Sequence, residues 1–232
     1  MHVLDNAVWH ALTGPHATLA ERAPNAARYQ PDVSVFGGVP DDAAPEAWDA
    51  LAGLLGPGGL AVVARRDRAV PDGWSVALDI PCRQMWLLGE LALDPAAGSA
   101  EAHMPYDTLG ATDVPEMLAL VERTKPGPFL RRTVELGTYV GIRDGGDLVA
   151  MAGERLHVPG FTEISAVCTD ASQRGRGLAS RLVRVIVAGI RARGETPFLH
   201  LTMENEPAHR LYDALGFETR ALADVVGVCA PE

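Results

Sequence analysis

The sequence predicts an α/β protein of the mixed α+β type, and three features of its C-terminal part support this fold class. Two apolar runs, 138–143 and 148–158, flank Asp-Gly-Gly-Asp at 144–147, which is typical of an antiparallel hairpin. An apolar run at 162–169 leads into a glycine-rich turn and then into a helical pattern. A further apolar run at 198–203 precedes a second helical pattern. A doubly wound nucleotide-binding fold does not begin with a hairpin, so that fold is disfavoured.

The first hundred residues alternate shorter helices and strands. The pattern predicts a helix at 5–12, a strand at 33–39, a helix at 45–55, and strands at 60–65, 74–78 and 83–88. The glycines at positions 56, 58 and 59 follow a helix and precede a strand, so no helix N-terminus faces them. This half is therefore predicted to lack a phosphate-binding loop of its own.

A polar segment rich in small residues, 94–101, divides the chain into two predicted domains, 1–100 and 101–232. The second domain is predicted to begin with a strand at 104–109, a helix at 113–124 that is capped by Asp113, and a stiff Lys-Pro-Gly-Pro loop at 125–128.

The glycine-rich turn after the run at 162–169 is the most informative segment. The helix that follows, predicted over 176–193, carries an apolar face at four-residue spacing and is therefore expected to pack on a sheet. This packing would hold the N-terminus of the helix in one position. Backbone N–H groups from Gly175 to Ala179, together with the positive end of the helix dipole, suit a pyrophosphate. Gly175 and Gly177 have no side chain that would keep such a group away from the backbone.

Three kinds of phosphate-binding loop compete for this turn. A P-loop needs Gly-Lys-Ser/Thr, whereas Leu178 follows Gly177 and Lys125 is the only lysine of the chain, so a P-loop is excluded. A Rossmann loop would use Gly175, Gly177 and Ser180, but it should open a long βαβ series, and only about fifty residues remain. The third kind is the loop that holds the diphosphate of an acyl-CoA.

The helix at 205–215 is predicted from its ends and its apolar face. Asn205 is a suitable N-cap, and Gly216 suits a left-handed stop after the last turn. Ala208, Leu211, Tyr212 and Leu215 share one face of this helix. A tyrosine among inward positions needs a polar partner for its hydroxyl, and the sulfur of a cofactor is one candidate.

Two motifs in this order resemble those of the GNAT superfamily of N-acetyltransferases. Residues 174–179, Arg-Gly-Arg-Gly-Leu-Ala, are similar to the diphosphate loop of the family, Gln/Arg-x-x-Gly-x-Gly/Ala. Residues 205–217 are similar to its helix Asn-x-x-Ala-x-x-x-Tyr-x-x-x-Gly-Phe. The resemblance covers about residues 105–232 and implies a central mixed, mostly antiparallel sheet flanked by helices. Residues 1–100 loosely resemble the degenerate N-terminal half of two-part GNAT proteins.

The resemblance also implies a set of site residues. In this family the pantetheine arm of acetyl-CoA runs along a splayed strand edge, the glycine turn takes the diphosphate, and the tyrosine donates a proton to the departing thiolate. Carried over to this chain, the cofactor-binding residues are Val167, Cys168, Thr169, Arg174, Gly175, Arg176, Gly177, Leu178, Ala179, Ser180, Asn205, Ala208 and Tyr212. Tyr212 is the expected general acid.

Glu163 is the candidate general base. Strand alternation over 162–169 puts Glu163, Ser165, Val167 and Thr169 on one face, toward the edge expected to hold the cofactor. From there the carboxylate could accept the proton of the amine through water. A half-buried structural glutamate explains the pattern equally well. Cys168 points the opposite way, so core packing is the better interpretation of its thiol.

Composition narrows the function classes. The net charge of −10 disfavours nucleic acid and mildly favours a cationic or amine-bearing substrate. Three cysteines make no disulfide framework, and the histidines show no metal-ligand spacing, so no metal is expected. With no apolar run of membrane-spanning length and no basic leader, we expect a cytoplasmic protein that does not contact membranes.

We therefore expect an N-acetyltransferase that moves an acetyl group from acetyl-CoA to an amine in a ternary complex. The expected acceptor is a small molecule rather than a protein, and a homodimer is a possible assembly. A non-catalytic module that binds or senses acyl-CoA is the alternative, although it would not need a tyrosine donor. A nicotinamide-binding protein is a third reading, which NAD affinity would reveal.

Overall fold

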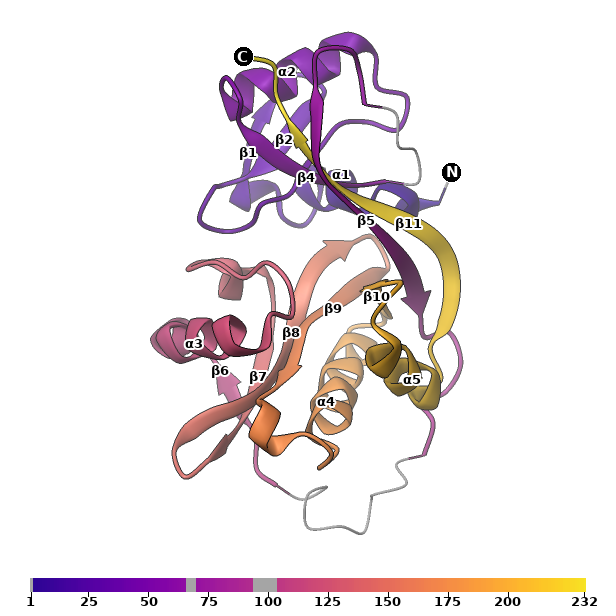
Figure 1. Ribbon diagram of the computed structural model, residues 1–232. Coiled ribbons are helices and arrows are strands. Elements are labelled where there is room, and N and C mark those ends of the chain that lie inside the picture. The colour runs from indigo at the N-terminus through magenta and orange to yellow at the C-terminus, as the bar shows by residue number, and fades with distance from the viewer. Residues whose placement is uncertain (1, 66–69, 94–103) are drawn as a thin grey trace.

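The computed structural model describes residues 2–65, 70–93 and 104–232. Its large sheet has eight strands in the order β4-β11-β5-β10-β9-β8-β7-β6, and a small sheet has the order β1-β2-β3. Only β9 and β10 pair in parallel, and the other neighbours in both sheets are antiparallel. The expected mixed, mostly antiparallel sheet flanked by helices is therefore confirmed (Figure 1). The predicted linker at 94–101 lies outside the described residues.

The elements have the following bounds. The strands are β1 (Ala20–Ala23), β2 (Ala26–Tyr29), β3 (Gly37–Gly38), β4 (Leu60–Arg65), β5 (Ser75–Trp86), β6 (Asp107–Leu109), β7 (Tyr139–Asp144), β8 (Asp147–Val158), β9 (Phe161–Thr169), β10 (Thr196–Thr202) and β11 (Glu218–Cys229). The helices are α1 (Ala7–Thr13), α2 (Pro45–Leu55), α3 (Val114–Thr124), α4 (Leu178–Ala192) and α5 (Glu206–Leu215), with short 3₁₀ turns η1 (Val3–Asn6), η2 (Ala17–Leu19), η4 (Ala111–Asp113), η5 (Thr133–Leu136) and η6 (Ala171–Gln173). Among the described residues, no helix combines the length and apolarity needed to span a bilayer.

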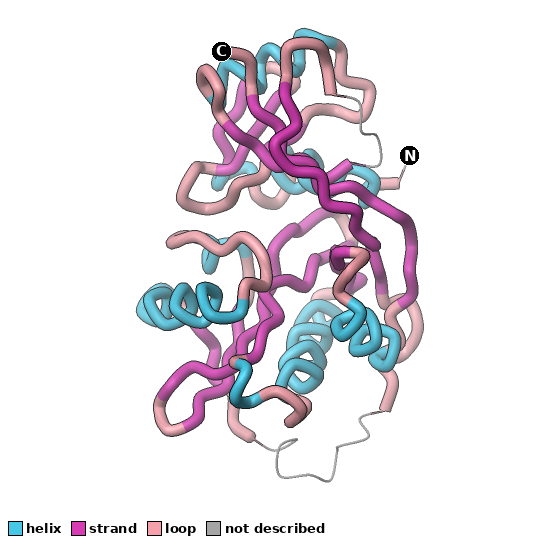
Figure 2. The backbone as a smooth tube through the Cα atoms, in the orientation of Figure 1, coloured by secondary structure: helices cyan, strands magenta, loops and turns pink. Residues whose placement is uncertain are grey.

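The chain forms two lobes that β5 and β11 connect (Figures 1 and 2). The upper lobe in the figures contains α1, α2 and β1 to β4, and the lower lobe contains α3, α4, α5 and β6 to β9. β11 runs between β4 and β5, so a strand from the second predicted domain completes the sheet of the first. The division at residue 100 stays a prediction.

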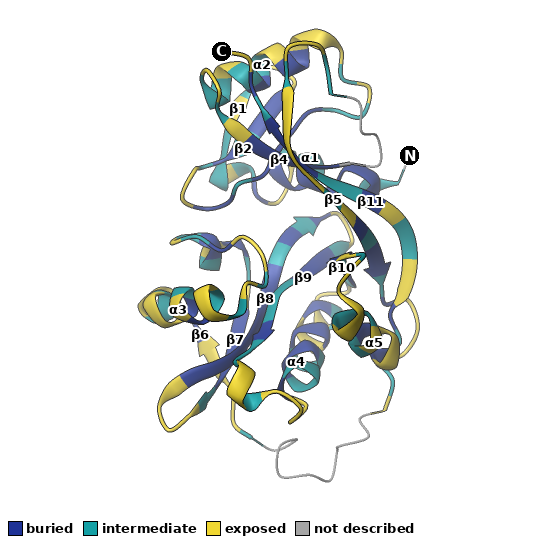
Figure 3. Ribbon diagram, viewed as in Figure 1, coloured by how far each residue is buried: buried dark blue, intermediate teal, exposed yellow. Residues whose placement is uncertain are grey.

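The helices of the lower lobe cover opposite faces of the sheet. Helix α4 buries its apolar face on one side, where it packs with residues of β7, β8 and β10, and α3 packs with β6, β7 and β8 on the other. Figure 3 shows the inward side of α4 buried and the outer side of α3 exposed. The predicted helix at 176–193 begins two residues later, because Gly177 is its N-cap in the left-handed conformation, with φ of +74°.

Several predicted strands of the upper lobe differ from the structure. The runs at 74–78 and 83–88 are one continuous strand, β5, which pairs with β11 across Pro81. The strand predicted at 33–39 is wrong except at Gly37–Gly38, because the N–H groups of Val33 and Ser34 turn back to the Gln30 carbonyl. Strands β1, β2 and β11 were not predicted.

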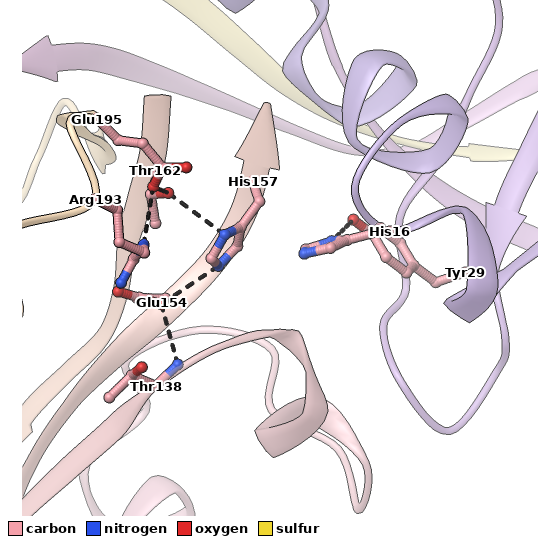
Figure 4. Close-up of polar contacts among 8 residues, drawn as sticks. All are labelled: His16, Tyr29, Thr138, Glu154, His157, Thr162, Arg193 and Glu195. Carbon is pink, nitrogen blue, oxygen red and sulfur yellow. Dashed lines mark hydrogen bonds and ion pairs between the residues drawn. The ribbon is translucent and has the colours of Figure 1, made fainter. Parts of the chain in front are cut away.

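The lobes also meet at a cluster of polar side chains (Figure 4). His16 of the upper lobe faces His157 of β8, with ring centroids 5.1 Å apart. The Nδ1 atom of His16 lies 2.7 Å from the Tyr29 hydroxyl. Behind His157, the Glu154 carboxylate accepts hydrogen bonds from Arg193 at 2.8 Å and from the Thr138 N–H at 3.1 Å.

Candidate active site

A cavity of about 800 Å³ opens between the two lobes and extends to the N-terminus of α4. The predicted cofactor-binding residues that line it are Val167, Cys168, Thr169, Arg174, Gly175, Gly177, Leu178, Ala179, Ser180, Asn205, Ala208 and Tyr212. Arg176 does not line it and instead lies 3.8 Å from Asp144 in an ion pair. The structure thus brings together segments that are 45 residues apart, from 167 to 212, around one space.

The cavity follows a split between two parallel strands. β9 and β10 are paired only at their beginnings, where Thr196, Pro197 and Phe198 lie opposite Phe161, Thr162 and Glu163. β10 nevertheless continues to Thr202, and its other edge pairs with β5. Past Glu163, peptide groups on the facing edges of both strands are therefore released from the ladder. Such an edge can hydrogen-bond an extended amide-containing ligand.

The glycine turn presents an open backbone at the head of α4. Gly175 and Gly177 have φ of +80° and +74°, a conformation that favours glycine. Nothing lies within 4 Å of a Cβ built on either residue. The first N–H groups of a helix have no partner in the helix, and the dipole adds positive charge there. The Arg174 guanidinium donates to the Thr169 carbonyl at 3.4 Å, which holds this cation beside the turn.

Tyr212 presents its phenol to the cavity from α5. Asn205 caps this helix as predicted, because its Oδ1 accepts from the Ala208 N–H at 3.2 Å. The Tyr212 ring packs edge-on against Phe217, with centroids 5.5 Å apart, and only 6% of the residue is exposed. Burial, with a smaller contribution from the Glu163 charge, raises the pKa of the Tyr212 phenol above its ordinary value. The phenol is therefore protonated at neutral pH and can donate a proton.

A β-bulge in β9 overturns the alternation expected for this strand. Pairing shifts from Met151 with Cys168 to Gly153 with Ser165, so β9 carries one extra residue, and Ala166 has φ of +54°. Residues before and after the bulge are therefore out of phase. Ile164 and Val167 both pack on the α4 side, whereas Cys168 packs with α3.

The expectation that Glu163 and Val167 share a face is wrong for this reason. Glu163 has no exposed surface, and it does not line the cavity. The Arg155 guanidinium donates to both of its oxygens, at 2.7 Å from Nε and 2.6 Å from Nη2. Although burial opposes ionisation, the nearby Arg155 charge and hydrogen bonds lower the pKa of Glu163 to about 2.

Arg155 and His200 lie between Glu163 and the cavity, and sequence reasoning did not single out Arg155. His200 Nδ1 is 2.7 Å from Glu163 Oε1, and its Nε2 is 3.0 Å from the Gln84 amide nitrogen. An amide nitrogen donates, so Nε2 accepts and Nδ1 carries the proton that binds Glu163. Both Arg155 and His200 line the cavity. The only available sequence sign was an arginine inside the apolar run of β8.

The thiol of Cys168 lies in the core, as the sequence indicated. The residue packs with α3, and burial raises the pKa of its thiol to about 11. A thiol that stays protonated at neutral pH is a poor nucleophile.

Comparison with known proteins agrees with the fold. Residues 139–225 match the FR47-like protein family. A protein of Novosphingobium aromaticivorans assigned to the GNAT acetyltransferase family has a solved structure that is 37% identical, with a TM-score of 0.86 and full coverage of both chains. A GCN5-related N-acetyltransferase from Kribbella flavida is 19% identical, with a TM-score of 0.62 over 97% of this chain and 94% of that one, which supports the fold alone.

Two curated relatives match shorter stretches. The N-alpha-acetyltransferase RimI of Mycobacterium tuberculosis is 39% identical over 83 residues, which are 34% of this chain and 51% of the relative. Mycothiol acetyltransferase of Corynebacterium glutamicum is 36% identical over 75 residues, which are 32% of this chain and 26% of the relative. The chain thus spans about half or less of the curated relatives that it matches.

The class of protein that emerges is an acyltransferase. Since 37% identity extends over the whole of both chains in the Novosphingobium comparison, the chain belongs to the GNAT family of acetyltransferases. The expected family and enzyme class are thereby confirmed.

Proposed function

We propose that this protein transfers an acetyl group from acetyl-CoA to the amine of a small molecule, by direct attack within a ternary complex. The observation that carries the proposal is the shared cavity: one space is lined by an open strand edge, an open glycine turn and a protonated tyrosine. Each of the three suits a different part of an acyl-CoA.

The parts of the donor would be held by different groups of the chain. The backbone at Val167 and Thr169 lies on the released edge of β9, where it can hydrogen-bond the amides of the pantetheine arm. The N–H groups from Gly175 to Ser180 can take the diphosphate, and Arg174 adds a positive charge beside them. Asn205 and Ala208 line the wall that such an arm would follow.

The chemical step requires one proton at the leaving group. The amine nitrogen attacks the thioester carbonyl carbon, the carbon–sulfur bond breaks, and Tyr212 donates its phenolic proton to the departing thiolate. No described residue hydrogen-bonds the Tyr212 hydroxyl, so its proton is not engaged within the part of the chain that the structure describes. The amine gives up its own proton to a base.

Glu163 as that base stays an untested prediction, and its contacts support a different role better. A carboxylate with a pKa of about 2 is a weak base, because an efficient general base has a pKa near the working pH. Both of its oxygens are already occupied by Arg155 and His200. We infer that Glu163 positions these two side chains at the cavity wall.

A thiol-release assay tests the proposal. Purified protein is mixed with acetyl-CoA and a panel of small amines, and free CoA is measured, with calorimetric titration of CoA as the binding control. We expect saturable release that depends on the amine and an acetylated product of the expected mass. CoA binding without release from any amine would instead support a non-catalytic acyl-CoA module. NAD binding without CoA binding would exclude both.

A further inference from the structure

The charges around the cavity carry information about the acceptor, and this step rests on the function proposed above. Although the chain has a net charge of −10, the described residues that line the cavity include no aspartate or glutamate. Its ionic side chains are Lys125, Arg155 and Arg174. Arg174 lies beside the glycine turn, where the donor diphosphate would neutralise it. Arg155 lies at the opposite end, between the lobes.

Arg155 keeps donor capacity toward the cavity in spite of its ion pair. The bonds to Glu163 use Nε and Nη2, and among the described residues no partner of Nη1 is found. The side chain retains 14% exposure, whereas Glu163 has none. The pair is therefore oriented, with the guanidinium at the cavity and the carboxylate behind it. The guanidinium also stacks over Phe36, 4.9 Å from the ring centroid, which holds it in place.

The wall beside Arg155 is apolar. One face of the adjoining strands β4, β11 and β5 supplies Val62, Val225, Leu78 and Ile80, and Phe36 adjoins Val62. Leu78 is 44% exposed although it lies within a long paired strand. An exposed apolar side chain in the same cavity as a cationic fork suits a ligand with an apolar part and an anionic part.

We propose that the acceptor is a free amino acid or a close analogue: an amine on an apolar body that also carries a carboxylate. The carboxylate would hydrogen-bond the Nη1 end of Arg155, and the apolar body would lie on the face formed by Val62, Leu78, Ile80 and Val225. Polycationic amines are disfavoured, because no acidic side chain among the described lining residues can pair with them. The lining therefore opposes the cationic acceptors that the net charge mildly favours, and it leaves the expectation of an amine-bearing acceptor in place.

Matched acceptors test the assignment directly on the wild-type protein. Leucine, leucinamide and 3-methylbutylamine share one apolar body and differ only at the carboxylate, and spermidine represents the polycations. We expect kcat/KM to be at least about 10-fold higher for leucine than for either relative that lacks the carboxylate. The amine of leucinamide is less basic than that of leucine, so near pH 8 a larger fraction of leucinamide is unprotonated and able to attack. A preference for leucine over leucinamide would therefore oppose the difference in free amine.

A substitution on the apolar face provides the second arm. Leu78→Glu adds a carboxylate to the cavity wall at a half-exposed strand position, and this carboxylate would repel that of leucine. The substitution should therefore lower kcat/KM for leucine at least about 10-fold, and lower kcat/KM for leucinamide and 3-methylbutylamine by less. Leu222→Glu is the matched control: Leu222 is 64% exposed on β11 and does not line the cavity, so its kinetics should equal those of the wild type. Arg155→Lys should shrink the preference for leucine over 3-methylbutylamine, if a melting curve shows that it folds.

The outcomes separate this inference from the proposed function. Equal use of leucine, its amide and its amine, or a preference for spermidine, would overturn the amino-acid assignment and leave N-acetyltransfer standing. Release only with peptides that lack a free carboxylate near the amine would also overturn it. No release from any acceptor, with CoA binding intact, would overturn both.

Discussion

The Arg155 guanidinium holds both oxygens of the Glu163 carboxylate, at 2.7 Å and 2.6 Å, in a position where Glu163 has no exposed surface. Two neighbouring strands of a hairpin supply the pair, since Arg155 is on β8 and Glu163 on β9. The free-energy cost of removing both charges from water is offset only when the two groups lie close and share two hydrogen bonds, as they do here. The pair therefore holds Arg155 at the cavity wall, and His200 makes a third contact with Glu163.

Replacing Glu163 distinguishes a positioning role from a catalytic one. Glu163→Gln leaves Arg155 buried beside a neutral partner, so we expect the free energy of unfolding to fall by about 3 kcal/mol. Because we place Glu163 behind the wall, the pH at which kcat/KM begins to rise should be unchanged in the variant. Chemical denaturation and a pH–rate profile measure the two effects. Loss of the ascending limb with an intact fold would identify Glu163 as the base after all.

Tyr212→Phe tests the general acid. The substitution removes one hydroxyl for which the described residues supply no hydrogen bond, so the melting temperature should change little and CoA affinity should be retained. Turnover should fall by roughly 100-fold, because the thiolate must then leave without a proton donor. Steady-state kinetics with acetyl-CoA and calorimetry with CoA measure these quantities. Undiminished turnover would refute the role of Tyr212.

The glycine turn offers a matched pair of variants at the two ends of α4. Gly177 and Gly194 have nearly equal φ, +74° and +75°, and nothing lies within 4 Å of a Cβ built on either. Gly177→Ala and Gly194→Ala should therefore each lower the free energy of unfolding by about 1 kcal/mol through backbone strain. Only Gly177 lines the cavity, so only Gly177→Ala should weaken CoA binding, by about 10-fold. Equal CoA affinity in the two variants would place the diphosphate elsewhere.

Local pattern predicted several elements of both lobes, because hairpins, caps and amphipathic helices are decided by neighbouring residues. The bounds of α2 and β4 agree with the prediction, and the ends of β7, β9 and α4 differ from it by two residues or fewer. β11 was missed, since Asp224 and Gly227 interrupt its alternation and its pairing with β4 is distant in sequence. Composition gives only the net charge of the whole chain. The positive charge around the cavity could not be predicted from it, because that charge depends on which residues the fold brings together.

The bulge at Ala166 shows why the site itself was harder to predict. An alanine in the sequence does not indicate a left-handed backbone, yet Ala166 has φ of +54°. The side chains before Ala166 are therefore out of phase with those after it, and a position expected on one face of the sheet lies on the other. Glu163 was therefore assigned to the face of Val167 by a rule that holds only for an unbroken strand. The motif residues were less affected, because the backbone of β9 and the start of α4 contribute N–H and C=O groups rather than side chains.

The burial of His16 next to His157 makes the stability of the protein depend on pH. Burial, and then the neighbouring His157, lower the pKa of His16 from 6.5 to about 4. Between these two values the unfolded chain binds a proton that the folded chain excludes, so stability falls as pH falls through this window. The loss should amount to about 3 kcal/mol from pH 6.5 to pH 4, in addition to the effects of other groups.

His16→Asn isolates this contribution, because the Asn amide cannot take up a proton but offers both a donor and an acceptor for the hydrogen bond that Nδ1 shares with the Tyr29 hydroxyl at 2.7 Å. We expect urea unfolding of the variant at pH 7 and pH 5 to show a smaller difference between the two pH values than the wild type. His10→Asn, on the half-buried side of α1, should retain the wild-type difference. If His16→Asn retains it too, the junction between the lobes accommodates a charged His16, and the acid sensitivity of the fold arises elsewhere.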